Sequence, residues 1–418
     1  MNALFATFDL FPSPKGAGTH IAQTALALES AYKQVHLMVL GHGDMPGYQE
    51  EGRIVLHRCL AAHPNFLRRS EYFGEFLDAA VSRMGEIPGY VHFRDIWSGL
   101  PLLEHPRLKQ SVKVFEVNGL PSVELPCHYP ALSGNVSLLK SLRTMEDYCL
   151  SHADGIITVS DTGRRYLSAR GVPDDKICVV ANMAHLPEEM DLTGESPHPP
   201  EGDFLLYAGT ASPWQGLPLL LEAFRMIQDD HNVRLLLALS NRKHLKGLRR
   251  LIRKARLEER VGIHTGLTRE EMYRLYQGAL FSAAPLTRCD RNELQGCSPI
   301  KILESMACGT PVVASRLPVC GEIITHGKDG LLFTPDSVRS LARAMETLLS
   351  DRASLAALGR EAARKIQEKH NGVLWTKSFL QTCSSFMIKE ERNDEERKRS
   401  TRYRRGSKEG EALRPLEV

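Results

Sequence analysis

The same local pattern, an apolar strand followed by a glycine-containing loop and a helix, occurs twice in this chain of 418 residues. The first copy runs from the strand at 3–8 through Gly16 and Gly18 to a helix near 21–28, and the second begins at 204. Each unit is typical of the start of a doubly wound parallel sheet. Glycines after a first strand let the backbone approach a phosphate. The sequence therefore predicts an α/β protein of two Rossmann-like domains, with ligands in the cleft between them.

A proline-rich, acidic stretch at 187–202 lacks an apolar period and is predicted to be a linker. It separates a first domain at 1–186 from a second at 203–374. Residues 375–388 have the pattern of an amphipathic helix, which we expect to pack back toward the first domain. Residues 389–418 are nearly all charged, so we expect a disordered tail.

The stretch 297–315 carries the strongest signal for a binding site. Ser298 is predicted to cap a short helix whose first residue is Pro299. The free N–H groups and the dipole of such a helix start favour an anion, and Lys301 adds a full positive charge there. Glu304, one turn further, offers a carboxylate to a sugar hydroxyl. A phosphate cradle, a cation and a hydroxyl acceptor together fit a sugar nucleotide.

The residues of this stretch resemble the signature of the retaining glycosyltransferases of family 4, which have the GT-B fold. That signature usually has two glutamates separated by seven residues. Glu304 matches the second, whereas Gly296 stands at the first, and residues 298–304 resemble the sub-pattern Ser-Pro-x-Lys-x-x-Glu. The resemblance implies metal-independent transfer of a sugar from a nucleotide-diphosphate sugar to an acceptor hydroxyl, with retention of configuration.

The resemblance also implies which residues bind the donor. In the family the second glycine loop usually carries an arginine after its first glycine and a lysine before its second, but here these positions are Thr210 and Gln215. We expect Lys301 to replace the two missing cations at the diphosphate, and Glu304 to hold the ribose. The predicted donor-binding residues are Gly16, Gly18, Gly209, Thr210, Gln215, Gly216, Gly266, Ser298, Pro299, Lys301 and Glu304.

Three residues of the first half are predicted to lie on the acceptor side. Relatives often have a His-x-His-Asp run at positions 92–95, where this chain has Arg94 before Asp95. These two residues either face the acceptor or form an ion pair that shapes the loop. Asn118 stands where relatives often have a histidine, and it either holds a sugar hydroxyl or is a turn residue. The expected catalytic residues are Glu304, Lys301 and Asn118.

Several other classes of protein fit the sequence poorly. The loop at 16–18 matches only half of a nicotinamide-dinucleotide fingerprint, because Ile21 stands at the third small position. The nine cysteines show no zinc-site spacing, and Asp-x-Asp, a metal motif of other glycosyltransferases, does not occur. A net charge of +3 does not indicate nucleic acid. No apolar run reaches the roughly 18–20 residues of a membrane span.

We therefore expect no metal or cofactor beyond the nucleotide-sugar co-substrate. The expected acceptor is a glycan, a lipid-linked molecule or a small molecule. The expected place is the cytoplasm, with a peripheral contact to the inner face of the membrane. Two alternatives remain: an epimerase-type enzyme that acts on the nucleotide sugar without an acceptor, and an inactive binding protein. The inactive binding protein remains an alternative because the chain departs from common family patterns at five positions. These are Arg94, Asn118, Thr210, Gln215 and Gly296.

Overall fold

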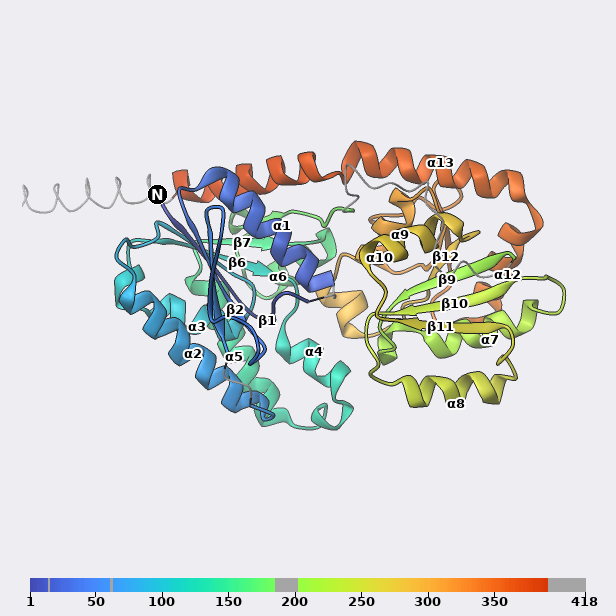
Figure 1. Cartoon of the computed structure of the whole chain (residues 1–418), viewed down its shortest axis with the longest axis horizontal. Coiled ribbons are helices and arrows are strands. Elements are labelled where there is room, and N and C mark those ends of the chain that lie inside the picture. The colour runs from blue at the N-terminus through green and yellow to red at the C-terminus, as the bar shows by residue number, and fades with distance from the viewer. Residues whose placement is uncertain (14–15, 61–62, 185–201, 390–418) are drawn as a thin grey trace, which may run out of the picture.

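The computed structural model describes residues 1–13, 16–60, 63–184 and 202–389, which form two α/β domains side by side (Figure 1). The predicted linker, except Gly202, and the predicted tail, except Lys389, lie outside these ranges. Within the described ranges, no helix is both long and apolar enough to cross a membrane.

The first domain is built on an eight-stranded sheet of order β3-β4-β2-β1-β5-β6-β7-β8. All neighbours are parallel except β3, which is antiparallel to β4. The strands are mostly buried apolar runs, as expected when helices cover both faces. They are β1 (Ala3–Leu10), β2 (Val35–Leu40), β3 (Tyr48–Glu51), β4 (Ile54–Cys59), β5 (Tyr90–Phe93), β6 (Val112–Val117), β7 (Gly155–Thr158) and β8 (Ile177–Val179).

Helices cover the two faces of this sheet unequally. One face packs against α1 (Gly16–Ala31) and a C-terminal helix at 372–389. The other packs against α2 (Phe66–Arg83), α3 (Ile96–Glu104), α5 (Val136–His152) and α6 (Asp161–Ala169). The short α4 (Pro121–His128) has no buried residue and faces the second domain.

The second domain is built on six parallel strands of order β11-β10-β9-β12-β13-β14. They are β9 (Phe204–Gly209), β10 (Arg234–Leu239), β11 (Val261–Thr265), β12 (Ser282–Ala284), β13 (Val312–Ser315) and β14 (Leu331–Phe333). One face carries α7 (Leu217–Ile227), α8 (Leu245–Ala255) and α12 (Val338–Ser350). The other carries α9 (Arg269–Gly278), α10 (Ile300–Ala307) and α11 (Pro318–Gly321), and α13 (Arg352–Lys369) contacts both cores.

Both sheets reverse their strand order at the first strand, which is the doubly wound arrangement. The reversal lies between β1 and β5 in the first domain and between β9 and β12 in the second. Ligands of such sheets bind outside the carboxyl ends of the strands at these points. The prediction of two Rossmann-like doubly wound domains is confirmed, and it places the ligand crevice at the loops after β1, β5, β9 and β12.

The helix at 372–389 crosses back onto the first domain (Figure 1). Trp375, Phe379 and Phe386 are buried in the same core as β1 and β2. The hydroxyl of Tyr90 on β5 lies 3.0 Å from Cys383 Sγ on this helix. These buried contacts tie the C-terminal end of the second domain to the first sheet.

The two domains touch through polar groups that come from the ends of helices. The Glu322 carboxylate accepts hydrogen bonds from the free N–H groups of Asp161 (3.0 Å) and Thr162 (2.8 Å) at the start of α6. Gly296 has φ +83°, and a Cβ added there would lie 2.6 Å from Ser160 Oγ. A side chain at 296, such as the family glutamate, therefore has no room in this arrangement.

Local predictions differ from the structure at two helix starts. Gly16 and Gly18 were predicted to lie in a loop, but they belong to the first turn of α1. A Cβ on Gly18 would come 2.2 Å from the Ser13 carbonyl oxygen, so only glycine allows the preceding loop to pack this closely against α1. Pro299 is the residue before α10 rather than its first residue, and the Ser298 side chain caps nothing; these predictions were wrong.

Candidate functional site

Lys301 lies at the start of α10, against the loop that follows β9. Its Nζ donates a hydrogen bond to Gln215 Oε1 at 2.5 Å and lies 3.4 Å from the Tyr207 hydroxyl. The same amine is 4.5 Å from the centre of the Tyr207 ring, a cation–π distance. Tyr207 is fixed in turn because its hydroxyl donates to the Thr210 carbonyl at 2.6 Å. The structure therefore brings Lys301 and Gln215 into contact, and Tyr207 links them to Thr210.

Two glycines allow this close approach of the loop and the lysine. Gly209 has φ +141°, and an added Cβ would lie 2.8 Å from Lys301 Nζ. Gly216 has φ +71°, and an added Cβ would lie 1.7 Å from the Pro285 carbonyl oxygen at the end of β12. Any larger residue at either position would displace the cation or separate the loops at the switch point.

The charge of Lys301 has little compensation. In the described part of the chain no carboxylate lies within ion-pair distance of its amine; its near partners are an amide oxygen and a phenol. Burial lowers the pKa of Lys301 to about 7. A desolvated amine without a counter-ion is an electrostatic site that an anion would complete.

Glu304 follows Lys301 by one helical turn. Its Oε2 lies 3.5 Å from the hydroxyl of Tyr276 on α9. Burial raises the pKa of Glu304 to about 7, although Arg269, Tyr276 and Lys301 act in the opposite direction. This carboxylate therefore keeps free acceptor capacity next to the cation, which suits a ligand hydroxyl.

The starts of α1 and α10 meet at the domain junction (Figure 1). A Cβ added to Gly16 would lie 3.2 Å from Ile300 Cδ1. Asn182, at the end of the first domain, donates to the Ser298 carbonyl at 3.1 Å. The positive ends of two helix dipoles thus face the same region as Lys301, and each favours an anion.

A second polar cluster lies on the first domain, around the buried carboxylate of Glu116 on β6. This carboxylate accepts hydrogen bonds from His20 Nε2 (2.5 Å), His92 Nε2 (2.8 Å) and Asn118 Nδ2 (2.6 Å). Arg94 Nε is 3.6 Å away. Burial alone would raise the pKa of Glu116, but the charges of His20 and Arg94 and the histidine hydrogen bonds hold it well below its usual range.

This cluster orients two of the predicted acceptor-side residues. Because the Asn118 amide N–H₂ is held by Glu116, the amide oxygen is left as a free acceptor on a half-buried side chain. Arg94 is 7 % exposed and lies 3.6 Å from both Glu116 and Asp9, yet its Nε and Nη1 have no hydrogen-bond partner in the described structure. Both side chains follow strands that end at the crevice.

Asp95, in contrast, is engaged by the protein itself. Its Oδ1 accepts from Ser98 N at 2.8 Å and caps α3, and its Oδ2 accepts from Phe8 N at 2.7 Å. Asp95 therefore links the end of β1 to the start of α3 through these hydrogen bonds. Gly266 follows the edge strand β11, two strands from β9, and no described contact links it to Lys301.

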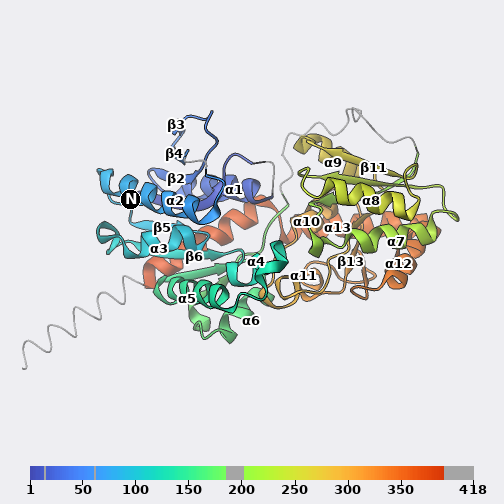
Figure 2. The ribbon, with the colours of Figure 1, turned by 90° about the horizontal axis from the view of Figure 1, so that it is seen from below.

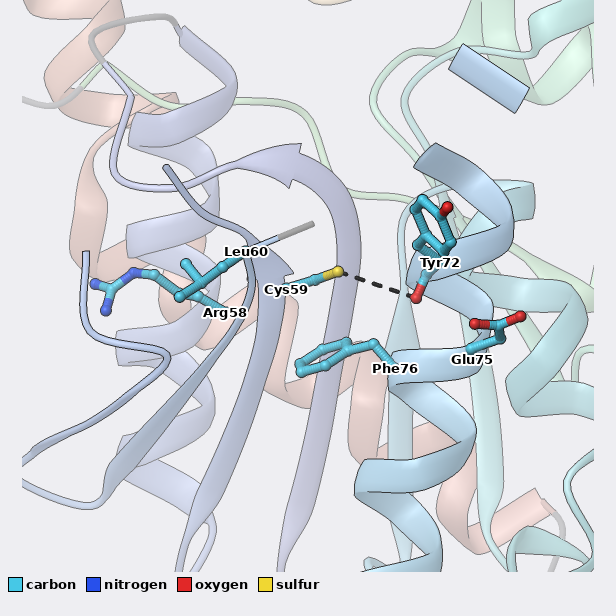
Figure 3. Close-up of a pocket in the computed structure, with 6 residues that line it drawn as sticks. All are labelled: Arg58, Cys59, Leu60, Tyr72, Glu75 and Phe76. Carbon is cyan, nitrogen blue, oxygen red and sulfur yellow. Dashed lines mark hydrogen bonds between the residues drawn. The ribbon is translucent and has the colours of Figure 1, made fainter. Parts of the chain in front are cut away.

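A separate pocket of about 520 Å³ lies between the end of β4 and α2 (Figure 3). Arg58, Cys59 and Leu60 line one side, and Tyr72, Glu75 and Phe76 the other. None of the predicted site residues lines it. In the described ranges no group of three His, Cys, Asp or Glu side chains is placed to hold a metal ion.

The sequence analysis missed four residues that shape these sites: His20, Glu116, Tyr207 and Tyr276. Glu116 carried a usable signal, because an acid inside the apolar strand run Val112–Val117 must be paired to be buried. The two tyrosines carried none, since an aromatic residue in a strand or helix usually belongs to the core.

Two family models match the chain, one for each domain. Residues 15–183 match "Glycosyl transferase 4-like domain", and residues 191–365 match "Glycosyl transferases group 1". An uncharacterized glycosyltransferase, MJ1607, of Methanocaldococcus jannaschii is 24 % identical over 89 % of this chain and 94 % of its own length. A D-inositol 3-phosphate glycosyltransferase of Kineococcus radiotolerans is 29 % identical over 53 % of this chain and 55 % of its own length.

Solved structures show the same architecture. Sucrose-phosphate synthase from Thermosynechococcus elongatus has a TM-score of 0.76 at 19 % identity, over 92 % of this chain and 99 % of that one. Anabaena Alr3699/HepE in complex with UDP-glucose has a TM-score of 0.68 at 16 % identity, over 92 % and 100 %. With both domains matched by glycosyltransferase families, and with these neighbours sharing its two-domain fold, this chain is a glycosyltransferase with the GT-B fold.

Proposed function

We propose that this protein transfers a sugar from a nucleotide-diphosphate sugar to an acceptor hydroxyl, with retention of configuration and without a metal ion. The observation that carries the proposal is the place of Lys301, at the start of α10 and against the Gly209 loop. It is a desolvated cation, and no carboxylate of the described ranges pairs with it. A diphosphate supplies the missing negative charge. The structural neighbour HepE, solved in complex with UDP-glucose, supports a donor of this class.

In the proposed reaction the bond between the sugar C1 and the diphosphate oxygen breaks, and a bond from C1 to the acceptor oxygen forms on the same face. The acceptor proton passes to the departing diphosphate. Lys301 and the N–H groups at the starts of α1 and α10 stabilise the charge that develops on the diphosphate. Glu304 accepts a hydrogen bond from a ribose hydroxyl, which fixes the nucleotide.

We infer that the acceptor lies on the first domain, across the crevice from Lys301. The free amide oxygen of Asn118 would accept a hydrogen bond from a sugar hydroxyl. The acceptor class that we propose is a glycan or glycoconjugate precursor, lipid-linked or small, and the place of reaction is the cytoplasm.

Differential scanning fluorimetry without metal tests the proposal. The panel contains the diphosphates of uridine, guanosine and adenosine and their sugars. A ligand at 100 times its dissociation constant adds about 2.7 kcal/mol to the free energy of unfolding. We expect one base to raise the melting temperature of the wild type but not of Lys301→Ala or Glu304→Ala.

The control is Arg343→Ala, an exposed cation on α12, which should keep the shift. A shift that survives in Lys301→Ala would contradict the donor site. An isomerised nucleotide sugar formed without an acceptor would instead indicate the epimerase-type enzyme.

A further inference from the structure

The second domain carries a strongly basic helix that the donor site does not use. Residues 242–256, which contain α8, include no Asp or Glu. Eight cations of this segment are exposed: Arg242, Lys243, Lys246, Arg249, Arg250, Arg253, Lys254 and Arg256. This segment is a local excess of positive charge in a chain whose 53 lysines and arginines are nearly balanced by 50 acidic residues.

Packing fixes the direction in which these cations point. Leu248 and Ile252 of α8 are buried in the core of the second domain, at 4 % and 5 % exposure. Leu245 and Ala255 pack against the same core, so the cations occupy the opposite, solvent-facing surface of the helix. Within the described residues none of the eight cations has an ion-pair partner, and the nearest acids along the chain, Glu258 and Glu259, lie beyond the helix end. The result is a band of uncompensated positive potential.

An exposed aromatic side chain of the first domain contacts this band, and an exposed valine follows it closely in the chain. Tyr129, at the end of α4, and Val136, the first residue of α5, border the segment between these two helices and are 54 % and 75 % exposed. Lys243 Nζ lies 5.6 Å from the centre of the Tyr129 ring, which joins the two domains at this point. Figure 1 shows α8 and this segment on the lower side of the molecule, and Figure 2, seen from below, shows both.

We propose that this face, formed by residues 242–256 and by Tyr129 and Val136, docks the protein on an anionic membrane surface. Exposed cations attract acidic headgroups at roughly 1 kcal/mol each, and the effect decays within a Debye length. A tyrosine and an aliphatic side chain next to such cations suit the headgroup region, where one end of the side chain is apolar and the other wet. Nucleic acid and soluble polyanions would use the cations but have no use for Val136.

The placement of the face relative to the crevice gives it a function. The chain passes from Asn118, at the end of β6, through α4 to Tyr129, so the docking face borders the proposed acceptor side. Docking there would bring the crevice to the headgroup level, within reach of acceptors held in the membrane. The docking itself does not depend on the identity of donor or acceptor.

Vesicle sedimentation tests the proposal with the full chain. The probes are vesicles of phosphatidylcholine alone and of phosphatidylcholine with phosphatidylglycerol in equal parts. We expect binding only to the anionic vesicles, and a fall in binding as salt is raised. The triple variant Lys246→Glu, Arg250→Glu, Arg253→Glu should bind at least about tenfold more weakly. Val136→Asp should weaken binding by a smaller factor.

The matched control reverses three exposed cations on α12 and α13, Arg339→Glu, Arg343→Glu and Arg360→Glu, which have no ion-pair partner in the described residues. It changes the net charge equally and should leave vesicle binding close to that of the wild type. Melting curves show whether each variant is folded. If both triple variants lost vesicle binding equally, net charge alone would explain the binding, and the proposal would be overturned. So would absence of binding to anionic vesicles, with or without binding to a single-stranded oligonucleotide or a sulfated polysaccharide.

Discussion

The two domains handle buried charge in opposite ways. On the first, Glu116 is surrounded by His20, His92, Asn118 and Arg94, and it stays ionised because the protein itself compensates it. On the second, Lys301 has no carboxylate partner among the residues that the structure describes, and burial lowers its pKa to about 7. The difference teaches that the protein itself balances the charge of Glu116, whereas we propose that a bound diphosphate balances the charge of Lys301.

The largest effect that we expect is the loss of stability on removing the compensated charge. Glu116→Ala leaves Arg94 and two histidines around an empty site, and it should lower the free energy of unfolding by about 3–5 kcal/mol. Chemical denaturation measures the change. Glu222→Ala, at an exposed position on α7, is the control and should stay within about 0.5 kcal/mol of the wild type. Similar values for both variants would remove the contrast between the domains.

Removing the charge of Lys301 should have the opposite effect on the free energy of unfolding. Lys301→Met removes a desolvated amine that lacks a counter-ion, so the ligand-free protein should become more stable, by about 1 kcal/mol. Turnover should fall by about 10²–10³ in Lys301→Ala, as when a group that stabilises developing charge is lost. Chemical denaturation without ligand measures the stability, and kinetics with the donor found by fluorimetry measures the turnover.

Gln215→Ala is the matched comparison, because it removes the partner of the cation but keeps the cation. Its turnover should fall by no more than about tenfold, the value of one hydrogen bond. Equal, small losses in the two variants would show that Lys301 does not replace the cations that the glycine loop lacks.

Proton uptake distinguishes an incomplete site from a complete one. Free Lys301 has a pKa of about 7 instead of the usual 10.5, so between these values the unfolded chain holds the extra proton and this residue's contribution to stability rises with pH. A bound diphosphate raises that pKa again, so binding at pH 8 should take up a proton. The donor dissociation constant should increase by up to about tenfold per pH unit above 7.

Titration calorimetry at pH 8 in two buffers of different ionisation enthalpy counts these protons. Lys301→Met should take up none from this site. Glu304 should cause the opposite proton exchange on binding. Its pKa of about 7 should fall when a hydroxyl donates to it, so binding below pH 7 should release a proton. Uptake that is unchanged in Lys301→Met would place the titrating group elsewhere.

The sequence predicted the fold well because the fold depends on patterns that repeat. Apolar strand runs with a glycine after the first, such as those near Gly16 and Gly209, recur in both halves and specify doubly wound sheets. Helix starts were predicted less well. Gly18 has the pattern of a loop glycine, yet it is required by close packing against Ser13. Such packing depends on tertiary structure and cannot be inferred from the local sequence.

The site was predictable only where a charge stands in an informative local pattern. Lys301 and Glu304 lie on a recognisable helix start, and the structure sets Lys301 against Gln215. Tyr207 carried no signal, and for Glu116 the sequence indicates only that a partner is needed, because the partners themselves come from other strands and helices. The lack of room at Gly296 depends on Ser160 of the other domain, which no local pattern reveals.

The smallest effect that we expect concerns Asn118, where the complete cluster meets the crevice. Glu116 holds the amide N–H₂ at 2.6 Å, so the oxygen is left for the acceptor. Asn118→Ala should raise the acceptor KM or lower turnover by about tenfold or less, with donor affinity unchanged. Asn118→Asp should be worse than alanine, because a second carboxylate beside Glu116 disturbs the charge balance. Steady-state kinetics with donor and acceptor varied separately measures both. A change in donor affinity of the same size would show that Asn118 belongs to the incomplete site and not to the compensated one.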